Sequence, residues 1–178
     1  MLSTREATLH DRNAIRSIYY AAFDKKEKDC VAKLAIDLLN LKTSPNTFSL
    51  VAERDHKLIG HIGLSPLYFE SDITLTAYIL APAAVMPDMQ KQGIGSKLIE
   101  SAIETLMKEG VNLLFVYGDP KYYGRFGFNA DNALNFMPPY DLEYSFGWMV
   151  RVLNETDVSS QQPLKLTCVA PLNDPALW

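Results

Sequence analysis

The sequence predicts an α/β fold, and two patterns carry that prediction. In the first, an apolar run ends at Val85, a short polar turn follows, and residues 94–107 have the spacing of an amphipathic helix. A second apolar run, residues 112–117, completes a strand–helix–strand unit, for which a right-handed crossover between parallel strands is expected. In the second pattern, two strand-like runs, residues 47–53 and 57–66, are joined by a polar turn and predict a hairpin.

The remaining elements follow from local signals along the chain. Thr8-x-x-Asp11 marks the start of a helix whose apolar stripe continues to Phe23, and a second helix is expected over residues 29–41. Asp119 and Pro120 predict the cap and first residue of a short helix. Further strands are expected in residues 3–9, 73–85, 144–153 and 164–169, with a strand and proline-ended loop in 129–139 and a polar loop in 154–162.

The turn between Val85 and the 94–107 helix has the composition of an anion site. A strand that leads through a glycine-bearing turn into a helix directs unpaired backbone N–H groups and the positive end of the helix dipole toward one point. Gly93 and Gly95 lack a Cβ, so a pyrophosphate can approach the main chain closely. By itself this pattern is also compatible with a tight turn that binds nothing. A dinucleotide fold and a nucleotide P-loop are disfavoured because the third glycine and the Gly-Lys-Ser/Thr sequence are missing.

The longer string Val85-x-Pro87-x-x-Gln90-x-x-Gly93-x-Gly95-x-x-Leu98 resembles the acetyl-CoA signature of the GCN5-related N-acetyltransferases, the GNAT family. The resemblance implies a mixed, mostly antiparallel central sheet with helices on both faces and a parallel strand–helix–strand core that binds acetyl-CoA. It also implies that the strand end contacts the pantetheine arm and that the loop wraps the CoA pyrophosphate. The residues concerned are Ala84 and Val85 on the strand, and Lys91, Gln92, Gly93, Ile94, Gly95 and Ser96 in the loop.

A second string, Gly118-Asp119-Pro-x-Tyr-Tyr-x-Arg-Phe-Gly-Phe, resembles one branch of this family, the bacterial predicted N-acetyltransferases. In the family a tyrosine four residues before the glycine faces the sulfur of CoA, which assigns that position to Tyr123. Many members carry an Asn where this chain has Asp119, so the usual pantetheine contact there is in question.

The resemblance implies an enzyme that moves an acetyl group directly from acetyl-CoA to a primary amine of an unidentified acceptor, either a small molecule or a protein, with Tyr123 as general acid for the CoA thiolate. The alternative is a non-catalytic acyl-CoA-binding module. Glu53, His61, Glu70 or a water relay could deprotonate the amine, and a structural role is favoured for His61. No metal is expected, because the three histidines are scattered and no cysteine pair has zinc spacing.

Composition bounds the remaining expectations. The 178 residues predict a single acetyltransferase domain, and a net charge of −4 argues against nucleic acid as a partner. No apolar run is long enough for a membrane span or a signal-peptide core, so a cytoplasmic location without membrane contact is expected. Cys30 and Cys168 are expected to be reduced core residues. The sequence leaves open whether the chain forms a homodimer.

Overall fold

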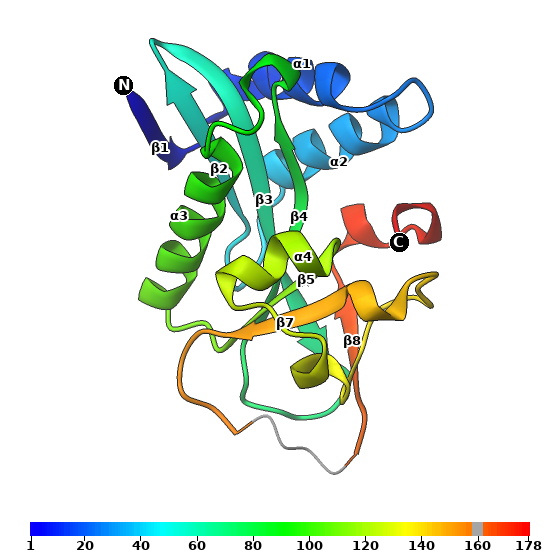
Figure 1. Ribbon diagram of the computed structural model, residues 1–178. Coiled ribbons are helices and arrows are strands. Elements are labelled where there is room, and N and C mark those ends of the chain that lie inside the picture. Colours follow the sequence, from blue (N-terminus) through cyan, green and yellow to red (C-terminus); the bar gives the residue numbers. More distant parts are fainter. Residues whose placement is uncertain (158–161) are drawn as a thin grey trace. The chain divides into compact units, whose positions relative to one another are not determined.

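The protein is described by a computed structural model that covers residues 1–157 and 162–178 (Figure 1). Its contacts group the chain into two compact units. The first unit comprises Met1–Ser65 and Ala81–Ala102, and the second comprises Pro66–Leu80 and Ile103–Trp178. Strands β3 (Lys57–Phe69) and β4 (Ala77–Val85) and helix α3 (Ile94–Lys108) each run from one unit into the other.

The strands of the first unit lie in the order β1, β2, β3, β4. β1 (Leu2–Glu6) pairs antiparallel with β2 (Phe48–Arg54), and β2 forms the predicted hairpin with β3. Asp55 and His56 close that hairpin with φ values of 51° and 62°, in the left-handed region that a tight turn requires. At the end of β4, the N–H of Met86 donates to the carbonyl of Ile59 on β3 at 2.8 Å.

Helices cover both faces of this first-unit sheet, as two glycines of β3 demonstrate. A Cβ built on Gly60 would lie 2.9 Å from Leu98 Cδ1 of α3, whereas one on Gly63 would lie 3.3 Å from Leu38 Cδ1 of α2 (Lys28–Asn40). Because side chains three residues apart on a strand point to opposite faces, α3 and α2 lie on opposite sides of β3. Helix α1 (Arg12–Ala22) shares the face of α2, since Tyr19 reaches His61.

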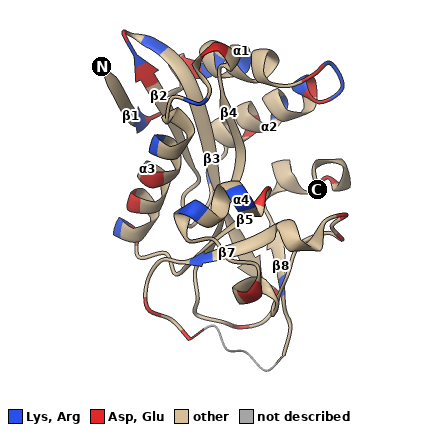
Figure 2. Ribbon diagram, in the orientation of Figure 1, with Lys and Arg blue, Asp and Glu red and all other residues tan. Residues whose placement is uncertain are grey.

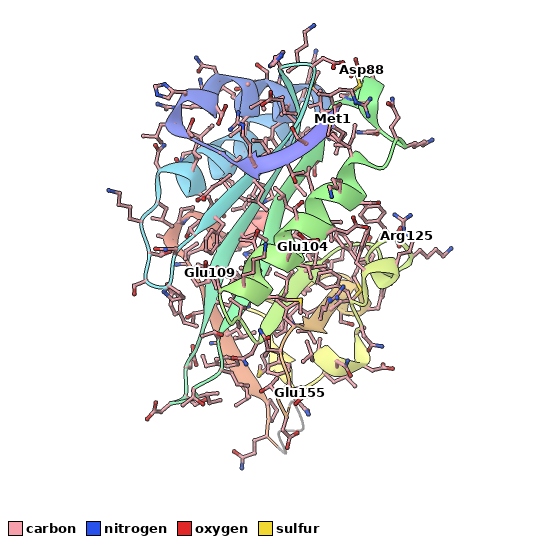
Figure 3. The ribbon with its side chains drawn as sticks, turned by 90° about the vertical axis from the view of Figure 1, so that its left-hand side faces the viewer. Met1, Asp88, Glu104, Glu109, Arg125 and Glu155 are labelled. Carbon is pink, nitrogen blue, oxygen red and sulfur yellow. The ribbon has the colours of Figure 1, made fainter. Side chains whose placement is uncertain are left out.

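The amphipathic patterns explain these helices. Ile15, Ile18 and Tyr19 are the buried residues of α1, and the predicted Thr8–Asp11 capping box begins the 3-10 turn that precedes it. Charged residues of both signs lie along the exposed face of α3, where Glu104 is found (Figures 2 and 3). The core of the first unit joins α1, α2, β2 and β4 through Ile15, Ile18, Tyr19, Ala32, Ala35, Ile36, Val51 and Ala84.

The second unit pairs β4 with β5 (Leu113–Tyr117) in parallel, with Ala77 opposite Leu113. β5 in turn pairs antiparallel with β7 (Trp148–Val152). The end of β3 pairs antiparallel with β8 (Leu164–Cys168), and the two-residue β6 (Phe136–Met137) pairs parallel with β8. Phe115 of β5 stacks on Trp148 at 4.9 Å and meets Phe136 edge-on at 5.3 Å, which centres the aromatic core of this unit.

The predicted fold class is confirmed, since the strand pairing is mixed and mostly antiparallel. Several boundaries differ from the prediction. The strand expected at 73–85 begins at Ala77, the one expected at 144–153 begins at Trp148, and β3 continues to Phe69. Residues 129–139 hold mainly a 3-10 turn, Asp131–Ala133, besides β6. The loop expected over 154–162 includes residues 158–161, which lie outside the described residues.

Candidate active site

The segment between β4 and α3 has the geometry of an anion-binding loop. A 3-10 turn, Pro87–Met89, is followed by an exposed stretch in which Lys91 has φ 60° and Gly93 has φ 80°. The N–H of Lys97 donates to the carbonyl of Gly93 at 3.0 Å and closes the first turn of α3. The N–H groups of the helix's first turn precede any intrahelical acceptor, so they point out of the helix end together with its positive dipole.

The glycine at position 93 fits a ligand that approaches the main chain. A Cβ built there meets no heavy atom within 4 Å, so the space over this residue is open. Its positive φ is also strained for any residue with a side chain. A phosphate-sized group therefore has both room and donors at this point of the loop.

Side-chain hydrogen bonds hold the loop in its conformation. Gln90 Nε2 donates to the carbonyl of Val85 at 3.2 Å, and Gln92 Nε2 donates to the carbonyl of Asp88 at 3.2 Å. Arg54 Nη1, from the end of β2, donates to Gln92 Oε1 at 2.8 Å. Sequence reasoning missed Arg54, because its contact joins residues 38 positions apart and no local pattern signals it.

At the end of β4, one edge of the strand is hydrogen-bonded to β3 and the other edge faces away from β3. Met86 N–H bonds to β3, and backbone groups alternate between the two edges of a strand. The N–H and carbonyl of Val85 therefore face away from β3, while those of Ala84 face β3. Ala84 is buried in the core of the first unit. Of these two residues, only Val85 has backbone groups on the edge that faces away from β3, where its carbonyl also accepts from Gln90 Nε2.

Tyr123 is held in the second unit by a short helix and a glycine. Asp119 caps α4 (Pro120–Tyr123), and its Oδ1 accepts from the N–H of Lys121 at 2.9 Å. The Asp119 carboxylate, whose role the family resemblance leaves in question, thus serves as a helix cap here. The Tyr123 ring lies so close to Gly118 that a Cβ there would be 2.5 Å from Cε2, and only glycine fits. Burial raises the pKa of Tyr123 to about 12, with a smaller contribution from Tyr122.

The candidate bases have structural partners of their own. His61 is fully buried, with Nδ1 2.7 Å from Tyr19 Oη and Nε2 3.2 Å from Ser49 Oγ, and burial lowers its pKa to about 3. Glu53 pairs with Arg5 at 3.3 Å. Glu70 pairs with Lys165 at 3.4 Å on the surface. This geometry supports the structural role favoured for His61.

The two cysteines differ from the expectation of two core residues. Cys30 is exposed on α2, so the expectation is wrong for this residue. Its position near the helix start places it off the buried stripe that contains Ala32, Leu34 and Ala35. Cys168 is half-buried, and burial raises the pKa of its thiol to about 11. Both are free thiols.

The described part of the chain has neither a metal-binding cluster nor a membrane-spanning helix. Over residues 1–157 and 162–178, no group of three or more His, Cys, Asp or Glu side chains is arranged to hold a metal ion. Within the same ranges, no helix combines the length and apolarity needed to cross a bilayer.

Fold and loop together define an acetyltransferase of the GNAT class, and comparison with known proteins agrees. The chain belongs to the acetyltransferase (GNAT) family, whose sequence model matches residues 12–128. The curated protein YjhQ of Escherichia coli K12, described as an uncharacterized N-acetyltransferase, is 33% identical over 162 residues, which are 88% of this chain and 84% of YjhQ. YhbS from the same strain, described likewise, is 33% identical over 103 residues, 57% of this chain and 60% of YhbS.

Solved structures confirm the fold. The crystal structure of E. coli YhbS in complex with CoA has a TM-score of 0.83, with 23% identity, covering 97% of this chain and 92% of YhbS. A GNAT acetyltransferase from Brucella melitensis, solved in complex with acetyl-CoA, has a TM-score of 0.70 and 26% identity, covering 97% of this chain and 98% of its own. The family and fold predicted from the two sequence strings are therefore confirmed.

Proposed function

We propose that this chain transfers an acetyl group from acetyl-CoA to a primary amine. The observation that carries the proposal is the open loop between β4 and α3, in which the left-handed Lys91 and Gly93 lead into the first turn of a 15-residue helix. The loop offers backbone donors and open space where a pyrophosphate needs both. The Brucella relative that was solved with acetyl-CoA supports this choice of donor.

In this proposal the loop residues from Lys91 to Ser96 hold the pyrophosphate, and the outward edge of Val85 aligns the pantetheine arm. The acceptor nitrogen attacks the thioester carbonyl carbon, so a C–N bond forms and a tetrahedral intermediate results. Collapse of that intermediate breaks the C–S bond. Tyr123, still protonated at neutral pH, donates a proton to the departing thiolate, and water restores the tyrosine proton.

The proposal assigns no side chain as the base. A fully buried His61 with a pKa of about 3 is a weak proton acceptor at neutral pH, which supports leaving it out. The amine proton leaves through water, or the acceptor binds already neutral. Rate should then rise with pH toward the pKa of the free amine acceptor.

The test is a titration followed by an assay. Isothermal titration measures acetyl-CoA binding, and a thiol-release assay with a panel of primary amines measures turnover, with mass spectrometry of the acetylated amine. We expect saturable binding and amine-dependent release of CoA. Absence of acetyl-CoA binding contradicts the proposal, whereas binding without amine-dependent release identifies a non-catalytic acyl-CoA-binding module.

A further inference from the structure

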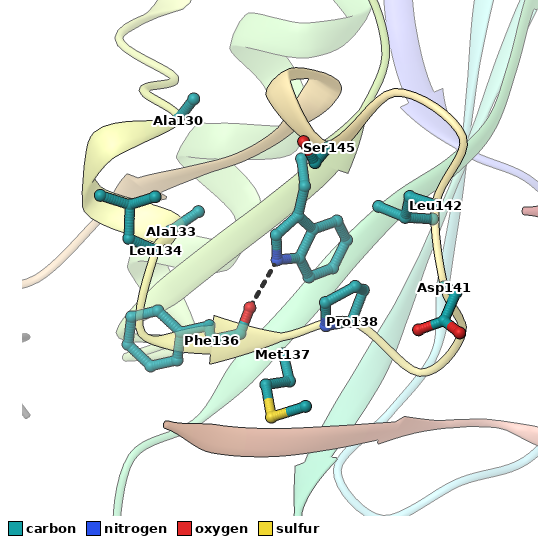
Figure 4. A pocket seen from close by; sticks show the side chains of 10 residues that line it. Ala130, Ala133, Leu134, Phe136, Met137, Pro138, Asp141, Leu142 and Ser145 are labelled. Carbon is teal, nitrogen blue, oxygen red and sulfur yellow. Dashed lines mark hydrogen bonds between the residues drawn. The ribbon is translucent and has the colours of Figure 1, made fainter. Parts of the chain in front are cut away.

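The second unit contains a cavity of about 480 Å³ that the proposed donor site does not use (Figure 4). That volume lies within the range of about 300–1,000 Å³ typical of small-molecule sites. Its lining comes from one stretch of chain between Ala130 and Trp148. Most of the lining is apolar, including Ala133, Leu134, Phe136, Pro138, Leu142 and Trp148.

The indole of Trp148 gives the cavity a fixed apolar wall. The residue is 5% exposed, and its ring stacks on Phe115 at 4.9 Å. Its Nε1 donates to the carbonyl of Phe136 at 2.9 Å, the bond drawn in Figure 4. Because the only polar atom of the indole is already satisfied, the ring offers a ligand an apolar surface held in place from two sides.

Several large apolar side chains in or next to the lining sequence are exposed to solvent. Leu134 is 77% exposed and Met137 is 47% exposed, and both line the cavity. Tyr144 and Phe146, on either side of the lining residue Ser145, are 52% and 62% exposed. An apolar cavity whose lining includes two large apolar side chains exposed to solvent, Leu134 and Met137, is typical of a binding site rather than of an ordinary surface.

The charge of the lining indicates the kind of ligand. Asp141 is the single charged residue among the lining residues, and it is exposed to solvent. Over the described parts of the chain, residues 1–157 and 162–178, no ion pair is formed by this carboxylate. A ligand that places a cation beside Asp141 and an apolar group against Trp148 complements both features, whereas an anion does not.

The segment that forms the cavity wall contacts the residue against which Tyr123 packs. The 3-10 turn Ser145–Gly147 packs on the end of β5, where Gly118 N–H donates to the carbonyl of Gly147 at 3.0 Å. A Cβ on Gly147 would lie 2.9 Å from the Gly118 carbonyl oxygen, so the two segments are in close contact. Gly118 is also the residue against which the Tyr123 ring packs. One glycine therefore contacts both the cavity wall and the proposed general acid.

We propose that this cavity binds the acceptor, and that the acceptor is a small primary amine carried on an apolar body. The apolar body packs against Trp148 and Leu134, and Asp141 attracts the ammonium form. The inference rests on the proposed function for the presence of an amine substrate. It adds the class of amine and the part of the chain that selects it.

The test compares two amines and two pairs of variants. 2-Phenylethylamine, which has an apolar body, should have a KM roughly tenfold below that of putrescine, which carries a second charge instead. Asp141→Asn and Leu134→Asn should each raise the KM for 2-phenylethylamine roughly tenfold, with kcat within about twofold and the KM for acetyl-CoA unchanged. Asp72→Asn and Leu9→Asn are matched controls, since both residues are exposed and outside the cavity lining.

A neutral competitor separates the roles of charge and apolar contact. 2-Phenylethanol has the same body without the ammonium group, so Leu134→Asn should weaken its inhibition while Asp141→Asn should leave it unchanged. Acetylation of putrescine in preference to 2-phenylethylamine, or variants indistinguishable from their controls, overturns the inference and leaves the proposed function intact. Failure of the wild-type chain to bind acetyl-CoA in a separate titration contradicts the proposed function instead.

Discussion

Tyr123 is partly buried, with its ring packed against Gly118 and Phe128. The neutral phenol is the form that burial favours, and the pKa is accordingly raised to about 12. A CoA thiolate, with an ordinary thiol pKa of about 8–9, leaves more easily when a hydrogen-bond donor or acid faces it. A tyrosine with its ordinary pKa of about 10 already holds its proton at neutral pH, and burial extends that protonated range to higher pH.

Replacement of Tyr123 by phenylalanine tests this role. Tyr123→Phe removes one oxygen and keeps the ring, so affinity for acetyl-CoA should be nearly unchanged while kcat falls by roughly 10²–10³-fold. The loss should shrink at higher pH, where the thiolate departs unaided. The measurement is kcat against pH, with Tyr122→Phe as the neighbouring control. Full activity of Tyr123→Phe contradicts the assigned role but not the choice of donor.

His61 should make the stability of the fold depend on pH. Its pKa is about 3 in the folded chain and about 6.5 when unfolded. Between these values the unfolded chain holds a proton that the folded chain lacks, so the stabilisation is complete above pH 6.5 and falls as pH drops toward 3. The slope attributable to this residue is about 1.4 kcal/mol per pH unit.

Urea unfolding from about pH 7.5 to about pH 4.5 measures this slope. His61→Gln should flatten it relative to the wild type, whatever its effect on stability at neutral pH. His10→Gln and His56→Gln, at two exposed positions, are the matched control variants. Equal slopes in wild type and His61→Gln contradict the low pKa in the folded state.

Among single residues, the sequence predicted those whose roles come from local backbone geometry. Gly93, with its positive φ, and Asp119, as a helix cap, could both be inferred from their neighbours. The exposure of Cys30 and the Arg54–Gln92 hydrogen bond could not. The first depends on how α2 is rotated against the sheet, and the second joins segments that are distant in sequence.

In the loop that leads into α3, backbone conformation should determine whether acetyl-CoA binds. Gly93→Val adds a branched side chain in the open space over the loop and at φ 80°, so binding of acetyl-CoA should fall below detection in isothermal titration. Gly110→Val, at the other end of the same helix, has φ 74° and equally open surroundings. It imposes comparable strain, roughly 1–2 kcal/mol, but should leave affinity unchanged.

The comparison of the two valine variants therefore separates loss of a binding site from loss of stability. Both should melt at similar temperatures in the absence of ligand, because each forces a side chain into the left-handed region. If Gly93→Val binds acetyl-CoA with wild-type affinity while folded, the assignment of the loop is wrong. If Gly110→Val loses binding equally, strain in the helix accounts for the effect.

Elements with a strong period were predictable, and elements defined by distant partners were not. α3, the β2–β3 hairpin and β5 follow from apolar spacing within each segment. β6 is two residues long and is a strand only because Phe136 lies opposite Leu164 of β8. The cavity beside it depends on the same long-range packing, so sequence reasoning did not find it.

The whole molecule is linked by elements shared between its two units. β3, β4 and α3 each continue from one unit into the other. Unfolding of these elements in one unit therefore disrupts their continuation in the other unit. We propose on this ground that the chain unfolds in one cooperative transition, as the expectation of a single domain requires. The proposed donor loop lies in the first unit, and Tyr123 lies in the second.

Binding of acetyl-CoA should then stabilise the entire fold. A ligand that binds only the folded state at a hundred times its Kd adds about 2.7 kcal/mol to the free energy of unfolding. For a chain of this size that corresponds to a rise in Tm of about 5–10 °C. Differential scanning calorimetry with acetyl-CoA should show one transition that shifts upward in the wild type and in Gly110→Val, but not in Gly93→Val. Two transitions, of which only one responds to acetyl-CoA, would show that the units unfold separately and would contradict the single cooperative domain while leaving the donor site in place.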